Sequence, residues 1–170
     1  DFEVRYTFGV SPLQQYLVAF PGGRLQALPF AWDTEKRRWF LVNPESGAAG
    51  DALHWTGRYQ NWNMMCAECH STQLRKGYDA DADTYDTRWQ AINVGCQSCH
   101  GPGADHVAWA VVAKDARPAS SGAAGKGLLA SFRNVDARTE VDACGACHSR
   151  RQRLTDGASP GKPLLDNYRP

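Results

Sequence analysis

The first 42 residues alternate short apolar runs with turn-forming or charged segments. The runs are rich in Val, Phe, Tyr and Leu, which is typical of β-strands. One connection, Pro21-Gly22-Gly23-Arg24, has the composition of a hairpin turn. We therefore predict a small antiparallel β-meander at the N-terminus, with strands over residues 2–10, 15–20, 25–32 and 38–42.

Beyond this region the pattern changes to helical pieces and loops. An apolar stretch at residues 107–113 and a second segment at 141–153 predict helices, whereas residues 116–127, rich in Ala, Ser and Gly, predict a surface loop. The last residues read as extended chain that needs a partner or further chain to pack against. The expected fold is mainly α and irregular with the β-meander in front, divided into residues 1–45, 46–156 and an extended tail at 157–170.

Composition and charge exclude several classes of protein. The chain has 170 residues, with 19 Lys and Arg against 18 Asp and Glu, so its formal charge of +1 offers no basic field for nucleic acid. No stretch approaches the roughly 18 apolar residues of a membrane span. We expect a soluble protein with neither a nucleic-acid partner nor a membrane span. The absence of a cap or signal before the first strand suggests a chain processed from a longer precursor.

The cysteines carry the chemistry. All six belong to three copies of one pattern, Cys-x-x-Cys-His, and none is left over. This is the attachment signature of c-type haem, in which two thiols bond to the porphyrin and the adjacent imidazole binds the iron. On a helical turn, residues three apart share a face, so both sulfurs can reach one porphyrin edge. The motifs are Cys66-Ala67-Glu68-Cys69-His70, Cys96-Gln97-Ser98-Cys99-His100 and Cys144-Gly145-Ala146-Cys147-His148.

Other uses of paired cysteines fit this sequence less well. Zinc ribbons, thioredoxin-like dithiols and disulfide frameworks do not need a His directly after the second Cys. Here all three pairs have one, although the chain has only five His. We therefore predict three covalently bound haem c groups and a haem-packed interior.

Counting histidines leaves one iron face unfilled. Three His serve as proximal ligands, so His54 and His106 remain for the opposite faces, whereas three bis-His irons need six imidazoles. His106 follows His100 by only six residues, so it serves a neighbouring haem more readily than its own. Met64 and Met65 directly precede Cys66 and are either ligands to a neighbouring haem or packing around porphyrin.

Two longer segments carry a family resemblance. Cys96–His100 is followed by Gly-Pro-Gly and His106, and His54-Trp55-Thr56-Gly57 leads through Asn61-Trp62-Asn63 into the first motif and Ser71-Thr72. In these segments the sequence resembles multihaem c-type cytochromes related to the tetrahaem cytochromes of ammonia oxidisers, and most closely the branch fused to tetratricopeptide repeats. The resemblance implies an exported protein with closely stacked, mostly bis-His haems that pass electrons.

The same resemblance implies ligand roles and missing neighbours. His70, His100 and His148 correspond to proximal ligands, His106 to a distal one, and His54 to a further distal one. Further Cys-x-x-Cys-His sites are implied before residue 1 and after residue 170. A His from such a segment, or from another subunit, would fill the sixth position left empty by the count.

Three functions remain open at this stage. The leading prediction is electron transfer between redox partner proteins through three haems. The second is a haem enzyme with one open iron face that acts on a small nitrogen oxide or hydroxylamine, motivated by the missing ligand. The third is a subunit of a larger redox complex or cytochrome filament. Because bacteria attach haem to thiols outside the cytoplasm, we expect a periplasmic or extracellular location.

Overall fold

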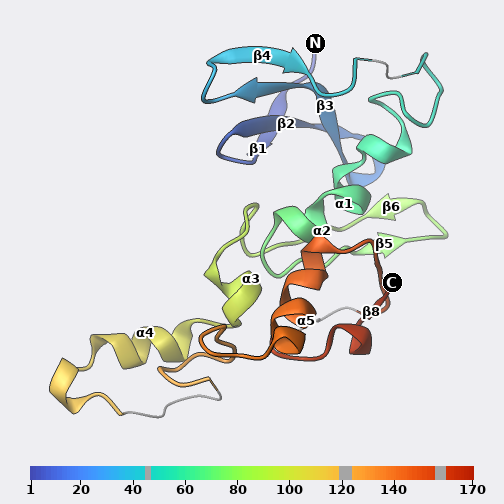
Figure 1. Ribbon diagram of the computed structural model, residues 1–170. Helices are drawn as coiled ribbons and strands as arrows, with labels where there is room; N and C mark the ends of the chain where they lie inside the picture. Colours follow the sequence, from blue (N-terminus) through green and yellow to red (C-terminus); the bar gives the residue numbers. More distant parts are fainter. Residues whose placement is uncertain (45–46, 119–123, 156–159) are drawn as a thin grey trace. The chain divides into compact units, whose positions relative to one another are not determined.

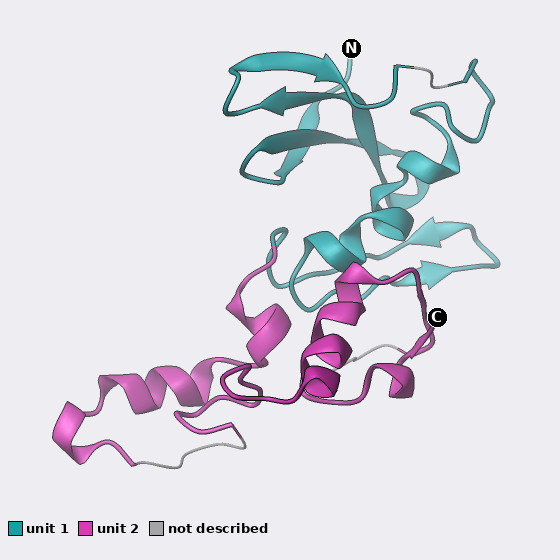
Figure 2. Cartoon of the chain, viewed as in Figure 1, with its two compact units in different colours: residues 1–93 teal, residues 94–170 magenta. Residues whose placement is uncertain are grey.

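The computed structural model describes residues 1–44, 47–118, 124–155 and 160–170. Clustering of the chain gives two compact units, residues 1–93 and residues 94–170, coloured teal and magenta in Figure 2. The division predicted from the sequence, with boundaries after residues 45 and 156, stays a prediction.

Unit 1 begins with a four-stranded antiparallel sheet in the order β1-β2-β3-β4, which confirms the predicted meander (Figure 1). The predicted hairpin forms as well, because the turn η1 joins two strands in which Phe20 pairs with Arg24. The first strand is shorter than predicted, since Gly9 at φ 76° turns the chain directly after it. The strands are β1 (Val4–Phe8), β2 (Leu13–Phe20), β3 (Arg24–Asp33) and β4 (Arg38–Leu41), with η1 at Pro21–Gly23.

The rest of unit 1 consists of single helical turns and one small hairpin. Its core joins the sheet to these turns, because Phe8, Leu17 and Leu25 from the strands cluster with Trp62, Ala67 and Leu74. The short elements are η2 (Arg58–Gln60), α1 (Trp62–Met65), α2 (Ala67–His70), β5 (Tyr78–Asp79) and β6 (Thr84–Tyr85).

Unit 2 contains the longer helices. The helix predicted at 107–113 is present but starts and ends earlier, and the helix predicted at 141–153 starts at residue 137 and ends at residue 148. Part of the loop predicted at 116–127, residues 119–123, lies outside the described residues. The elements are α3 (Cys96–His100), α4 (Ala104–Val111), η3 (Lys114–Ala116), α5 (Ala137–His148), β7 (Gln152–Arg153), η4 (Leu164–Asp166) and β8 (Tyr168–Arg169).

Two expectations differ from the structure. Helices account for 28% and strands for 25% of the described residues, so "mainly α" overstates the helix content. The reason is that three of the helices are single turns of four or five residues. The described part of the tail also folds back, since β8 pairs antiparallel with β7. No helix within the described ranges is long and apolar enough to cross a membrane.

Candidate functional site

The first Cys-x-x-Cys-His motif is built into the core of unit 1. Asn61 caps the preceding helical turn through its side chain, which accepts from the Met64 amide at 3.0 Å. The motif then starts at Cys66, between α1 and α2, and Ala67 is fully buried. Cys66 packs against the hydrophobic core, and this burial raises the pKa of its thiol to about 11. The core therefore fixes where the first motif stands.

A buried asparagine ties this motif to the sheet. The Oδ1 atom of Asn63 accepts from the Leu25 amide at 2.6 Å. Its Nδ2 atom donates to the Gly23 carbonyl at 3.2 Å and to the Thr87 hydroxyl at 2.9 Å. Asn63 is 1% exposed, and its bond to the Leu25 amide is buried, whereas the other two bonds are partly buried.

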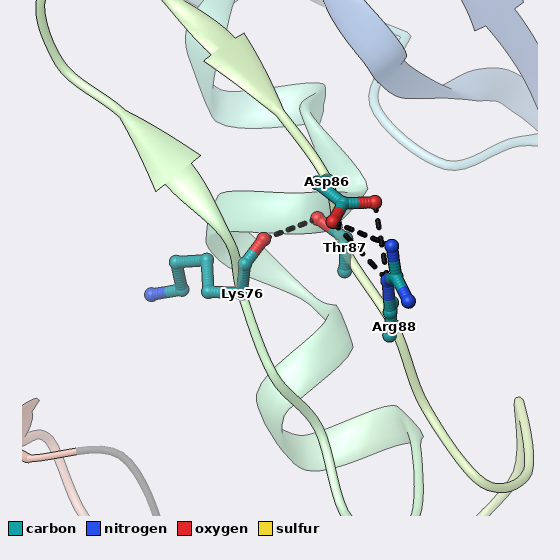
Figure 3. Close-up of polar contacts among 4 residues, drawn as sticks. All are labelled: Lys76, Asp86, Thr87 and Arg88. Carbon is teal, nitrogen blue, oxygen red and sulfur yellow. Dashed lines mark hydrogen bonds and ion pairs between the residues drawn. The ribbon is translucent and has the colours of Figure 1, made fainter.

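The network continues into the segment that follows the motif. Figure 3 shows the Thr87 hydroxyl donating to the Lys76 carbonyl, at 2.6 Å. The neighbouring pair of Arg88 and Asp86, with nitrogen and oxygen 2.9 Å apart, is exposed and adds little to stability. The sheet, α1 and the strand segments around Lys76 and Thr87 thus hold one another in register.

The imidazole of His70 lies beside a buried ring. Its centroid is 5.5 Å from that of Phe8, in an edge-to-face arrangement at 74°. Burial lowers the pKa of His70, because the cationic form loses hydration. A neutral imidazole is the form that binds a metal.

The second motif fills the helix α3. Gly95 precedes the helix and Gly101 ends it at φ 78°. A Cβ at Gly101 would lie 2.9 Å from the Leu129 Cβ. The residue after the motif therefore has to lack a side chain as well as adopt a positive φ. The Nδ1 atom of His100 lies 2.9 Å from the Ala130 carbonyl oxygen. Because a carbonyl only accepts, Nδ1 carries the proton and the lone pair of Nε2 is available to a metal.

The third motif occupies the last turn of α5. Asp136 caps the start of this helix, since its carboxylate accepts from the Thr139 amide at 2.7 Å. At the other end the Arg151 guanidinium donates to the Ala146 carbonyl at 2.8 Å and lies over the Tyr168 ring at 4.7 Å. Arg151 thus satisfies a carbonyl of the last turn.

His106 is held like His100. It lies on α4, and its Nδ1 is 2.7 Å from the Lys126 carbonyl oxygen, so Nδ1 is again the donor. Its ring is stacked on Trp109, with centroids 5.8 Å apart and planes at 19°. Its Nε2 is therefore prepared for a metal in the same way as that of His100.

His54 is held differently. Its Nδ1 lies 2.8 Å from the Thr56 hydroxyl and accepts from the Thr56 amide at 3.4 Å. An accepting Nδ1 places the proton of a neutral imidazole on Nε2. To bind a metal through Nε2, His54 has to carry the proton on Nδ1 instead. There the N–H can donate a hydrogen bond to the Thr56 hydroxyl oxygen.

The surroundings of the motifs fit a bulky apolar group. Val94 and Val141 precede the second and third motifs and are 54% and 62% exposed. In unit 2 the buried apolar residues of the described ranges are Ala130 and Tyr168, against nine in unit 1, so unit 2 has little side-chain core of its own. No disulfide joins any of the six cysteines, and four of them are exposed: Cys96, Cys99, Cys144 and Cys147. Exposed thiols outside disulfides, beside exposed apolar side chains, suit covalent attachment of a porphyrin.

Zinc and disulfides find no support in the geometry. Over the described residues, which include every Cys and His, no three side chains of His, Cys, Asp or Glu come together as metal ligands, and no disulfide joins the cysteines. Structural zinc sites need four such ligands, and catalytic zinc sites need three.

Several residues that shape the site were missed by sequence reasoning. Asn63 and Phe8 carry no local signal of their role. The carbonyls of Lys126 and Ala130 lie 20 and 30 residues from the histidines that they contact, and a backbone atom leaves no mark in the sequence. The one hint in the sequence to these carbonyl contacts is the Gly at position 127. The structure gives this residue a positive φ and tight surroundings that only Gly tolerates.

Comparisons with known proteins point to cytochromes. The family model described as cytochrome c554 and c-prime matches residues 42–101, which include the first two motifs. No curated protein sequence matches the chain.

Two solved structures are similar. The crystal structure of the outer cell wall cytochrome OcwA superposes with a TM-score of 0.56 at 23% identity and covers 93% of this chain and 30% of that one. An undecahaem cytochrome from the S-layer of Carboxydothermus ferrireducens has a TM-score of 0.40 and 26% identity, covering 62% of this chain and 14% of that one. The chain spans less than a third of either cytochrome. The family match and the first superposition give the chain a cytochrome-like fold.

Proposed function

We propose that this chain transfers electrons through three covalently bound c-type haems. One observation carries the proposal: each Cys-x-x-Cys-His motif lies on or directly beside a helical turn, with neither of its cysteines in a disulfide. The match of residues 42–101 to a cytochrome family supports it. The thiol pairs that bind haem are Cys66 and Cys69, Cys96 and Cys99, and Cys144 and Cys147.

The histidines divide into two groups. His70, His100 and His148 are the proximal ligands, because each follows the second Cys of its motif. His106 is a distal ligand, because its Nδ1 is already occupied by a carbonyl and its Nε2 is available. His54 is a second distal ligand, which takes that role with the proton on Nδ1. When bound, each haem supplies an Fe(III)/Fe(II) couple, and the protein sets its potential through axial ligands and burial.

Location and partners follow from the same chemistry. Haem attachment to thiols outside the cytoplasm places the protein in the periplasm or at the cell exterior. Other redox proteins donate and accept the electrons, and a further segment or subunit supplies the sixth axial ligand that five His leave open. Within the cytochromes, we place the chain near the branch fused to tetratricopeptide repeats.

The test begins with haem counting. We expect three haems per chain to stay attached after denaturation and acid extraction, measured as the pyridine haemochrome. Replacing both thiols of one motif by Ser should remove one haem each time: Cys66/Cys69, Cys96/Cys99 or Cys144/Cys147. Protein without covalently bound porphyrin, matured in a host that attaches haem, would refute the proposal.

The spin state then separates carrier from enzyme. Five histidines for six axial positions favour one open iron as the second candidate function. If the ferric protein is entirely low-spin and its spectra do not change with nitrite or cyanide, the carrier function stands. A high-spin haem that binds nitrite, and that persists when flanking chain is added, would instead support an enzyme for small nitrogen compounds.

A further inference from the structure

A single short segment contacts two of the candidate haem ligands. The Lys126 carbonyl accepts from Nδ1 of His106 at 2.7 Å, and the Ala130 carbonyl accepts from Nδ1 of His100 at 2.9 Å. The Ala130 amide also donates to the His100 carbonyl at 3.3 Å, so Ala130 is bonded to both the backbone and the ring of this histidine. The two imidazoles, six residues apart in sequence, are therefore anchored within five residues of chain.

The backbone of this segment has an uncommon conformation. Gly125, Lys126 and Gly127 follow one another with φ of 77°, 56° and 72°. Lys126 has a Cβ, so it occupies the left-handed region at a cost that its surroundings have to offset. The left-handed Lys126 carries the carbonyl that contacts His106, and Gly127 follows it directly.

Gly127 makes the close approach possible. A Cβ at this position would lie 2.6 Å from the His106 amide nitrogen and closer still to the Asp105 carbonyl oxygen. Real Cβ atoms do not approach backbone atoms that closely, and backbone cannot swing aside as a flexible side chain can. Any residue larger than Gly has to move the segment away from the start of α4.

An Nδ1–H bond to a carbonyl changes what the imidazole does as a ligand. It fixes the tautomer and the ring plane, and it makes Nε2 a stronger electron donor. A stronger axial donor favours the oxidised iron and lowers the reduction potential.

We infer that Lys126–Ala130 is a positioning clamp, whose Lys126 and Ala130 carbonyls fix Nδ1 of His106 and His100 so that both Nε2 atoms bind iron. This inference rests on the proposed function and extends it. The clamp couples the proximal ligand of the second motif to a distal ligand, so one segment sets the potential of every haem that these two histidines bind.

The chain offers a matched pair of variants for the test. Gly127→Ala and Gly125→Ala replace glycines with nearly equal positive φ, but only the first meets backbone, because a Cβ at Gly125 has nothing within 4 Å. Both variants place a Cβ on a backbone with a φ that residues other than Gly rarely adopt. The difference between them therefore measures the displaced clamp.

The readouts are haem content, electron paramagnetic resonance and redox titration of the complete holoprotein. In Gly127→Ala we expect all three haems to stay attached, the low-spin ferric signals of the haems bound by His106 and His100 to shift, and the potentials of those haems to rise. In Gly125→Ala we expect the signals of the unchanged protein. His106→Ala identifies one of the haems concerned, because the haem that it turns high-spin should be among those that shift in Gly127→Ala.

The outcomes distinguish this inference from the proposed function. If three haems are attached but Gly127→Ala and Gly125→Ala have the same potentials and spectra, the clamp is refuted and electron transfer stands. If no porphyrin is attached in the unchanged protein, the proposed function has failed as well.

A second measurement covers the case in which Gly127→Ala does not fold. In the unchanged holoprotein, reduced and labelled with ¹⁵N-histidine, we expect the Nδ1–H protons of His100 and His106 to exchange with deuterium about tenfold more slowly than that of the exposed His148. Equal exchange rates for the three protons would overturn the inference.

Discussion

Replacing Asn63 by Ala should destabilise unit 1, because it removes three hydrogen bonds of a buried side chain at once. The bonds to the Leu25 amide, the Gly23 carbonyl and the Thr87 hydroxyl are 2.6, 3.2 and 2.9 Å long. Each contributes about 1 kcal/mol net, and leaving the buried Leu25 N–H without a partner adds to the loss. We expect the free energy of unfolding to fall by about 3–4 kcal/mol, a large part of the roughly 5–15 kcal/mol of a typical domain.

The assay is urea unfolding of the holoprotein followed by far-ultraviolet circular dichroism. Thr87→Val keeps the size of the side chain and removes the bonds of the Thr87 hydroxyl to Asn63 and to the Lys76 carbonyl, so about half of the effect should appear. Asn93→Ala, at an exposed position of the same unit, should change stability by less than about 0.5 kcal/mol. If Asn63→Ala costs no more than Asn93→Ala, the hydrogen-bond network does not hold the first motif against the sheet.

Three further predictions follow from the same structure. In haem-free protein, burial raises the pKa of Cys66 to about 11 from the ordinary 9.0. At pH 8, maleimide should therefore label Cys66 about 100-fold more slowly than a thiol of ordinary pKa, as measured by mass spectrometry. Labelling as fast as that of exposed Cys96 would contradict this. The hydrogen bond from the Thr139 amide lowers the pKa of Asp136, so the stability that this cap contributes is present above pH 3.8 and is lost as the pH falls through the lower folded value. Asp136→Asn should remove that part of the acid dependence of helix content in circular dichroism, and an unchanged profile would show that the cap does not titrate. Gly23→Ala, at φ 73°, places a Cβ against the Tyr85 carbonyl, whereas the Cβ of Gly50→Ala, at φ 95°, has no atom within 4 Å. Gly23→Ala should therefore lower Tm by several degrees more than Gly50→Ala. Equal Tm values would argue against the close packing of η1 on β6.

The β-meander was predictable because its signals are local. Alternation of apolar runs and the Pro-Gly-Gly turn both act within a few residues, and the observed strands end within three residues of the predicted limits. The helix of the third motif was misplaced because its start depends on Asp136, whose capping bond gives residues 137–140, three of them polar, a helical conformation that their hydropathy does not indicate. The tail was predicted to be extended because its pairing with β7 joins residues 15 and 17 apart and leaves no local pattern.

The candidate ligands were named from the sequence, but the way in which they are held was not. Cys-x-x-Cys-His identifies thiols and imidazoles by spacing alone. The Lys126 and Ala130 carbonyls come from a loop 20 and 30 residues downstream of the histidines, and any residue type provides a carbonyl. His106 carries its proton on Nδ1 because a carbonyl lies beside it, whereas His54 accepts at Nδ1 from an amide. The spacing of residues in the sequence does not encode where these backbone groups lie.

The two units position their histidines by different physical means. In unit 1 the side-chain core positions the first motif, because His70 lies against the buried ring of Phe8 and Cys66 packs into the cluster around Trp62. In unit 2, where the described residues bury few apolar side chains, backbone carbonyls hold His100 and His106 through a left-handed turn. If the proposed haems are bound, substitutions in the sheet core should therefore disturb the haem of the first motif, whereas the glycine turn should control the irons bound by His100 and His106. On that proposal, a porphyrin that takes the place of much of a side-chain core leaves few side chains to orient a ligand, and the backbone, which no substitution removes, takes over that role.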